Sequence, residues 1–293
     1  MRNLSLAYPL LLAGFLFCSC SKDDSVKKDE AEETDETGTT KKVYSLDMSK
    51  TVWADEFDYE GSPDPAKWSY DTGGNGWGNN ELQNYTNTVK NASVKNGLLT
   101  ITAIKEILGS NQYTSARLVS KSKGDILYGR IEVKAKLPSG TGTWPAIWML
   151  PTFASYGNLS WPDNGEIDIM EHVGFDQGVV HANIHTKAFN HSIGTNKGDH
   201  INVANASQDF NVYACNWYPD SISFEVNGKR YFKFENNTSY NWTQWPFDRK
   251  FHILLNIAVG GNWGGQKGVD PAVFPQKMEV DYVRFYGIKE ENK

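Results

Sequence analysis

The stretch "YGRIEVKAKLP", residues 128–138, alternates apolar and charged side chains with a period of two. Its apolar positions are Ile131, Val133, Ala135 and Leu137, and its charged positions are Arg130, Glu132, Lys134 and Lys136. Successive side chains of a β-strand point to opposite faces, so this pattern predicts a strand with one buried face and one solvated face. Such strands are typical of antiparallel sheets that cover a core on one side.

Similar signals recur on both sides of this stretch. In "SISFEVNGKRYFKFE", residues 221–235, two alternating runs flank Asn227 and Gly228, a pair that favours the tight turn of a β-hairpin. Further strands are expected in "GLLTITAIK", "RLVSK", "VVHANIHT", "FHILLNIAVGG" and "MEVDYVRFYGI". The sequence therefore predicts an all-β fold, a jelly-roll β-sandwich of two curved antiparallel sheets with a concave cleft. A barrel is the alternative.

The composition agrees with many short strands and excludes one class of partner. The 293 residues include 10 Trp, 14 Tyr, 14 Phe and 26 Gly. Aromatic rings either fill a β core or stack on sugar rings. The formal net charge is −6, and residues 22–36 carry eight acids against three lysines, so the rest of the chain is nearly neutral. We expect a neutral polysaccharide as the partner, and no nucleic acid.

The N-terminus predicts export. Residues 1–19 read as a lipoprotein signal peptide whose "FCSC" ending makes Cys20 the expected lipidated residue, with Cys18 as an alternative acceptor and a plain cleaved signal as an alternative reading. Residues 20–43 are expected to form a disordered acidic tether, and residues 44–293 one catalytic domain. The "SKDD" that follows Cys20 favours exposure at the surface of the outer membrane. We expect a monomer that contacts the membrane only through its lipid anchor, with Cys215 as a core residue.

The stretch "GEIDIMEHVG", residues 165–174, holds three acids that a regular strand cannot place on one face. Glu166 and Asp168 share a face, but Glu171 lies an odd number of residues from both. A β-bulge at Ile169 or Met170 would shift the alternation by one residue and return Glu171 to the face of the other two.

Three carboxyls in a row favour glycoside hydrolysis with retention of configuration. In that chemistry one glutamate attacks the anomeric carbon, and the other protonates the leaving oxygen and then activates water. Asp168 would hydrogen-bond the nucleophile and separate the protonation states of its neighbours. The spacing alone does not assign the two glutamates.

The motif "GEIDIMEH", together with "GTWPAIWMLP" and "GNGWGNNELQNYT", resembles glycoside hydrolase family 16, and the resemblance extends from "VWADEFD" to "MEVDYVRFYG". It implies that Glu166 is the nucleophile, Asp168 its assistant and Glu171 the acid/base. The extra residue, Met170, resembles the laminarinase branch more than the shorter-motif lichenases.

The resemblance also implies a set of binding residues. The expected substrate contacts are Trp144, Trp148, Trp161, Asn79 or Asn80, Glu81, Arg117 and His185. Core packing is the alternative for each tryptophan, and an ordinary structural hydrogen bond is the alternative for His185. The spacing of His181 and His185 does not match a zinc motif. The resemblance implies no cofactor for catalysis, but a structural calcium at Glu56, the Gly97 carbonyl and Asp281, against the alternative of surface acids without an ion.

The activity expected from these features is endo-hydrolysis of β-1,3-containing, laminarin-type glucan. A mixed-linkage β-1,3-1,4-glucanase is the close alternative. Galactans, a transglycosylase and a non-catalytic glycan-binding protein are the further alternatives.

Overall fold

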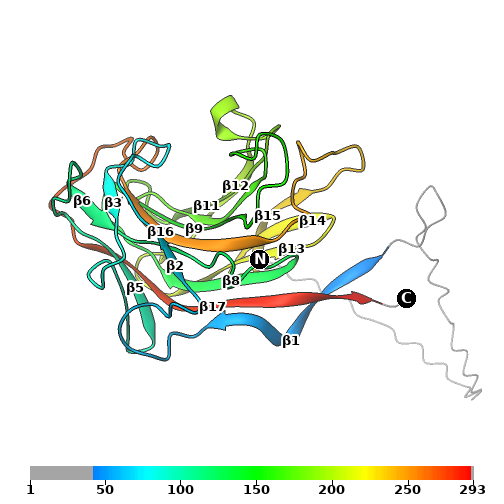
Figure 1. Ribbon diagram of the computed structural model, residues 1–293, viewed down its shortest axis with the longest axis horizontal. Coiled ribbons are helices and arrows are strands. Elements are labelled where there is room, and N and C mark those ends of the chain that lie inside the picture. The colour runs from blue at the N-terminus through cyan, green and yellow to red at the C-terminus, as the bar shows by residue number, and fades with distance from the viewer. Residues whose placement is uncertain (1–41, 292–293) are drawn as a thin grey trace, which may run out of the picture. The chain divides into compact units, whose positions relative to one another are not determined.

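Strands make up nearly all the regular structure of residues 42–291, the part of the chain that the computed structural model describes (Figure 1). These residues belong to one compact unit, Lys42–Asn292. They include one short 3₁₀ helix, η1 (His191–Ile193), and none of their helices has the length and apolarity needed to cross a membrane. The predicted signal peptide, the lipidation site Cys20 and nearly all of the predicted tether lie outside the described residues.

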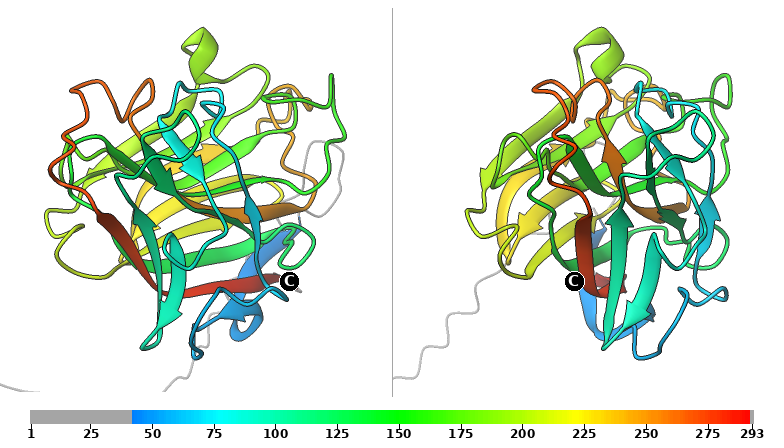
Figure 2. Two further views of the ribbon diagram at one scale, coloured as in Figure 1. Left: turned by 60° about the vertical axis from the view of Figure 1, so that its left-hand side comes forward. Right: turned by 90° about the vertical axis from the view of Figure 1, so that its left-hand side faces the viewer.

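Two antiparallel sheets pack face to face, as the sequence predicts (Figures 1 and 2). The eight-stranded sheet runs in the order β15 (Lys229–Glu235), β14 (Ser221–Val226), β13 (Asn211–Trp217), β8 (Gly129–Lys136), β17 (Gln276–Glu291), β5 (Leu98–Ala103) and β4 (Ala92–Lys95), with β1 (Val43–Asp55) paired to β17. The seven-stranded sheet runs in the order β12 (Lys197–Asn202), β11 (Val179–His185), β10 (Glu166–Glu171), β9 (Thr143–Pro151), β16 (Phe251–Val259), β7 (Arg117–Val119) and β2 (Ser69–Asp71). A small parallel pair joins β3 (Gln83–Tyr85) to β6 (Tyr113–Ser115).

The alternation of residues 128–138 is confirmed in β8. Ile131, Val133 and Ala135 are fully buried in the core between the sheets. The opposite, charged face of β8 is less exposed to solvent than predicted, because Glu132 is only 8% exposed. Arg130 covers it by donating from Nε to its carboxylate at 2.7 Å, and the charged face is therefore a packed ion-pair network.

The predicted hairpin is also confirmed. β14 and β15 are joined by Asn227 and Gly228, both with positive φ, at 50° and 77°. This is the conformation that a type I′ turn requires at its two central residues. Cys215 is a free, buried core residue in β13, as expected.

The seven-stranded sheet separates the core from a cleft. In β16, Ile253, Leu255 and Ile257 pack in the core. The alternate residues Leu254 and Asn256 line the cleft on the other face. Because side chains alternate along the strand, one sheet supplies both the core and the cleft floor.

Candidate active site

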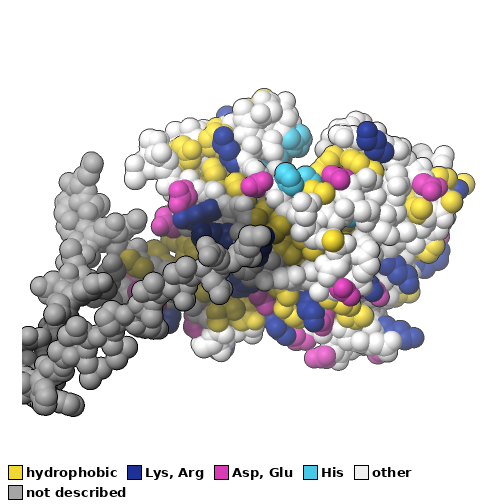
Figure 3. Space-filling model, turned by 180° about the vertical axis from the view of Figure 1, so that it is seen from behind, with side chains coloured by type: hydrophobic (Ala, Val, Ile, Leu, Met, Phe, Trp, Pro, Cys, Tyr) yellow, Lys and Arg dark blue, Asp and Glu magenta, His cyan; other side chains and the backbone are white. Residues whose placement is uncertain are grey.

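The cleft has a volume of about 650 Å³ and lies on the outer face of the seven-stranded sheet. Its floor is formed by β9, β10 and β16, and its rim by loops that include residues 77–81 and 159–161. The space-filling view in Figure 3 shows a notch in the upper surface of the protein, with histidine and acidic side chains beside it. A groove of this kind can accept a segment of a polymer.

The three acids of the motif all line this cleft because β10 contains the expected bulge. Its pairing with β9 shifts register between Asp168 and Met170, and its pairing with β11 shifts between Asp168 and Glu171. The consecutive residues Ile169 and Met170 both pack in the hydrophobic core. Two successive inward side chains return Glu171 to the face of Glu166 and Asp168.

Each glutamate accepts hydrogen bonds from neighbouring side chains. Trp144 donates from Nε1 to Oε1 of Glu171 at 3.0 Å, and Asn183 donates from Nδ2 to Oε2 of the same residue at 2.9 Å. Trp161 donates from Nε1 to Oε2 of Glu166 at 3.0 Å. Both carboxyls are therefore held in defined orientations within the cleft.

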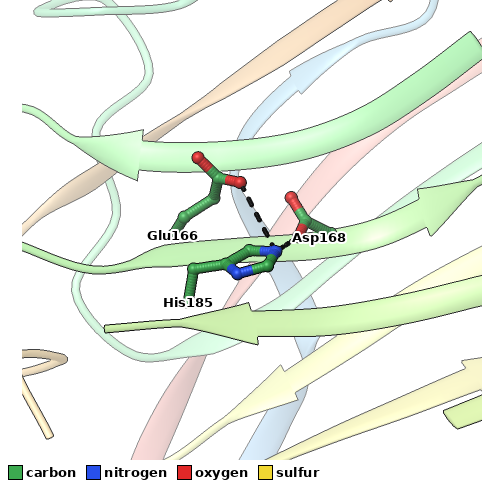
Figure 4. Close-up of side chains that lie close together, drawn as sticks. All are labelled: Glu166, Asp168 and His185. Carbon is green, nitrogen blue, oxygen red and sulfur yellow. Dashed lines mark ion pairs between the residues drawn. The ribbon is translucent and has the colours of Figure 1, made fainter. Parts of the chain in front are cut away.

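His185 lies beside Asp168 and Glu166 (Figure 4). Its Nε2 is 3.2 Å from Oδ2 of Asp168 and 3.9 Å from Oε1 of Glu166. The residue comes from β11, directly opposite Glu166 in the antiparallel ladder. The resemblance places this histidine near the acid/base, whereas its closest acidic contacts are with the other two acids.

Burial and mutual repulsion favour the protonated forms of the three acids. Burial, with the nearby Asp168 carboxylate, raises the pKa of Glu166 to about 8. Burial and the charge of Glu171 hold the pKa of Asp168 well above its ordinary value. Burial also raises the pKa of Glu171, although the nearby His185 and hydrogen bonds from Asn183 and Trp144 oppose that rise. Like charges this close do not all ionise readily, so the cluster retains protons at mildly acidic pH.

Arg117 and Trp148 form a second part of the cleft wall. The Arg117 guanidinium lies between two aromatic rings, 4.8 Å from the Trp77 centroid and 4.7 Å from the Trp148 centroid, and pairs with Asp71 at 3.1 Å. Trp148 donates from Nε1 to Oδ1 of Asn256 at 2.7 Å. These contacts fix a flat aromatic and cationic surface beside the acids.

The side chains of residues 79–81 lie partly in the cleft and partly outside it. Glu81 and Asn79 line the cleft, and Asn79 donates from Nδ2 to Glu81 at 3.3 Å. Burial raises the pKa of Glu81. Asn80, outside the cleft lining, donates instead to Asn262 at 2.8 Å.

The two acids expected to hold calcium, Glu56 and Asp281, form ion pairs with basic side chains. Arg284 donates to both carboxylate oxygens of Glu56, each at 2.8 Å, and Lys134 pairs with Asp281 at 2.6 Å. A calcium ion would compete with both cations for these carboxylate oxygens, so the calcium site stays a prediction of the resemblance.

Asn183, Asn256 and Tyr85 take part in the site but are not among the expected contacts, although Tyr85 lies within the quoted stretch "GNGWGNNELQNYT". Asn256 donates from Nδ2 to the hydroxyl of Tyr85 at 3.0 Å, while it accepts from Trp148. One signal in the sequence could have identified Asn183. It lies two residues from His185 in β11 and therefore shares its face.

Comparisons with known proteins agree with this arrangement. The model of glycosyl hydrolases family 16 matches residues 79–284. A β-glucanase of Rhodothermus marinus is 56% identical over 240 residues, which cover 80% of this chain and 84% of that protein. The crystal structure of the laminarinase from Rhodothermus marinus has a TM-score of 0.81 at 54% identity, covering 85% of this chain and 99% of the other. A non-specific endo-β-1,3(4)-glucanase has a TM-score of 0.78 at 44% identity, covering 84% of this chain and 94% of the other. The chain therefore belongs to glycosyl hydrolase family 16.

Proposed function

We propose that this protein hydrolyses internal bonds of β-1,3-glucans of the laminarin type, with retention of configuration. The observation that carries the proposal is the row of Glu166, Asp168 and Glu171 on the floor of an open cleft. Two carboxyls beside one bound sugar supply the nucleophile and the proton donor of a retaining glycosidase. The similarity to the Rhodothermus marinus laminarinase supports the choice of glucan.

The resemblance to family 16, carried over position by position, supports the assignment of the roles. Glu166 attacks the anomeric carbon, while Glu171 donates its proton to the leaving glycosidic oxygen. Glu171, now a carboxylate, then takes a proton from water, whose oxygen attacks the same carbon and displaces Glu166 from the covalent intermediate. The pKa values of both glutamates are raised, so the resemblance to family 16, and not the electrostatics, assigns the roles.

The side chains around the acids would bind the sugar units. Trp161 is 40% exposed, and Trp144 and Trp148 line the cleft, so all three can present apolar ring surface to sugar C–H faces. Arg117 and Glu81 add polar groups at the same wall. This mixture of flat apolar surfaces and a few polar groups suits a neutral polysaccharide.

A mixed-linkage β-1,3-1,4-glucanase is the second candidate. Its support is the likeness to the non-specific endo-β-1,3(4)-glucanase. Reducing-end assays with laminarin, barley β-glucan and agarose separate the candidates. We expect the fastest release of reducing ends from laminarin. Binding without release from any of the three would overturn the hydrolase proposal.

Azide rescue tests the roles of the two glutamates. Glu166→Ala and Glu171→Ala should each abolish hydrolysis of the polymer. With an activated aryl glucoside, azide should restore Glu166→Ala as an α-glycosyl azide and Glu171→Ala as the β-anomer. The reverse pattern of anomers would exchange the two roles.

We further propose, from the sequence alone, that the protein is a monomeric lipoprotein anchored through Cys20 at the outer cell surface. Labelling with a fatty-acid analogue and protease accessibility on whole cells test this proposal. A structural calcium stays a prediction of the resemblance and has no part in the proposed mechanism.

A further inference from the structure

We propose that Glu166, Asp168 and His185 also form a binding site for one transition-metal ion, with zinc as the best-fitting ion, and that the bound metal blocks hydrolysis. This metal site is inhibitory and lies inside the catalytic cluster. Within residues 42–291, these three side chains form the one group of three or more potential ligands close enough to share an ion.

The separations of the ligand atoms suit a small, four-coordinate ion. One atom from each residue lies within 4.8 Å of the others. The Nε2 of His185 is 3.2 Å from Oδ2 of Asp168 and 3.9 Å from Oε1 of Glu166. Zinc binds such atoms at about 2.1 Å in tetrahedral geometry, which puts neighbouring ligands about 3.4 Å apart. A small rotation of the Glu166 side chain therefore completes a three-ligand site with a fourth position open to the cleft.

A buried oxygen acceptor faces into the cluster and is available to a cation. Oδ2 of Asp168 is buried and accepts no hydrogen bond from any described residue, although His185 Nε2 lies 3.2 Å away. The two atoms are close, but they are not aligned as a donor and an acceptor. Asp168 and His185 are only 3% and 5% exposed, so water reaches them poorly. A shared metal ion would bind Oδ2 of Asp168 and the unprotonated Nε2 of His185, which leaves the ring proton on the buried Nδ1.

The charge of the cluster and its access also favour a cation. Three acids face one histidine, and the repulsion between them is relieved by a divalent ion. Glu166 and Asp168 line the open cleft, which gives the ion a route of entry. The imidazole nitrogen favours zinc over calcium or magnesium, which prefer oxygen ligands.

Bound zinc would occupy the lone pair with which Glu166 attacks the sugar. The metal and the polysaccharide would then compete for the same floor of the cleft. We expect zinc to raise KM for laminarin with little change in kcat, and a chelator to restore activity.

Isothermal titration of zinc chloride into the full-length protein tests the site without reference to activity. His185→Gln and Asp168→Asn should each weaken zinc binding by at least about tenfold, because even loss of an outer partner of a metal ligand costs about 10- to 100-fold. His200→Gln is the matched control, because this exposed histidine of β12 lies opposite His181 and outside the proposed ligand set. Calcium chloride is the control ion.

Zinc binding that is unchanged in both ligand variants, or lost in His200→Gln, would overturn the proposal. Failure of the wild-type protein to bind zinc at millimolar concentration would also overturn it. Circular dichroism of each variant verifies that it is folded. If His185→Gln does not fold, Asp168→Asn alone tests the loss of zinc binding. The titration does not depend on glucan hydrolysis, so failure of the metal site and failure of the proposed function are distinguishable.

Discussion

Asn183 donates a hydrogen bond of 2.9 Å from Nδ2 to Oε2 of Glu171, and the two residues lie on adjacent strands on the cleft side of the sheet. A donor of this kind stabilises the charged carboxylate and lowers its pKa. The strength of Glu171 as an acid therefore depends on a residue outside the sequence motif.

Asn183→Leu is expected to raise the pKa of Glu171. If Glu171 is the acid/base, the alkaline limb of the pH profile of kcat/KM moves to higher pH, and kcat falls by about tenfold or more. Steady-state rates across a pH series measure both effects. Asn262→Ala, which alters an amide outside the cleft lining, should leave the profile unchanged. A shift confined to the acidic limb would instead identify Glu171 as the nucleophile.

Trp161→Ala should weaken catalysis with little effect on stability. The side chain is 40% exposed and donates to Glu166, so its removal takes away an exposed ring, to which we assign sugar stacking, and an orienting donor. We expect kcat/KM for laminarin to fall by about 10- to 100-fold, and the unfolding free energy to change by less than about 1 kcal/mol. Trp161→Phe retains a ring without the donor, and should recover KM more than kcat. Trp217→Ala, at a fully buried position, is the contrasting control, with an expected loss of about 3–5 kcal/mol.

Deletion of Met170 should cost stability but keep the three acids on one face. The shortened segment, Glu-Ile-Asp-Ile-Glu, alternates without a bulge, so both glutamates still face the cleft. Loss of a buried methionine lowers the unfolding free energy by about 2–5 kcal/mol. Urea denaturation and a laminarin assay measure the two effects. A folded deletion variant with no detectable hydrolysis would contradict this account of the bulge.

Glu166→Gln should stabilise the fold near neutral pH. Burial raises the pKa of Glu166 from 4.5 to about 8, so the stability associated with its protonated form is complete below about pH 4.5 and is lost as pH rises to about 8. Glutamine does not titrate and avoids this loss. Since one pKa unit corresponds to about 1.4 kcal/mol, the variant should exceed the wild type by at least about 1 kcal/mol near pH 8. Chemical denaturation at about pH 4 and about pH 8 measures the difference, which should nearly vanish at the lower pH. An equal difference at both values would show that packing, and not charge, causes it.

The sequence predicts the strands that have one apolar face and misses strands without one. β8 and β16 are recognisable because burial imposes a pattern on their side chains. β12 lies at the edge of its sheet and is almost wholly exposed, so no apolar alternation marks it. Its position follows from pairing with β11, a contact that the local sequence does not encode.

The residues of the site also include some that the local sequence predicts and some that it does not. The bulge in β10 is predictable because three acids in a short strand leave few alternatives for their alignment. The arrangement of Arg117 between Trp77 and Trp148 joins residues from distant segments, and only the folded structure brings them together. The pairing of Glu56 with Arg284 is also a long-range contact, which is why the predicted calcium ligands are engaged elsewhere.

The seven-stranded sheet separates the cleft floor from the hydrophobic core, and this limits how the protein can evolve. In β16, an altered Asn256 changes the surface of the cleft floor, whereas its neighbours Leu255 and Ile257 are fixed by packing. New substrate preferences on this scaffold should therefore arise first in the rim loops, such as residues 159–161, where an insertion leaves the partition intact.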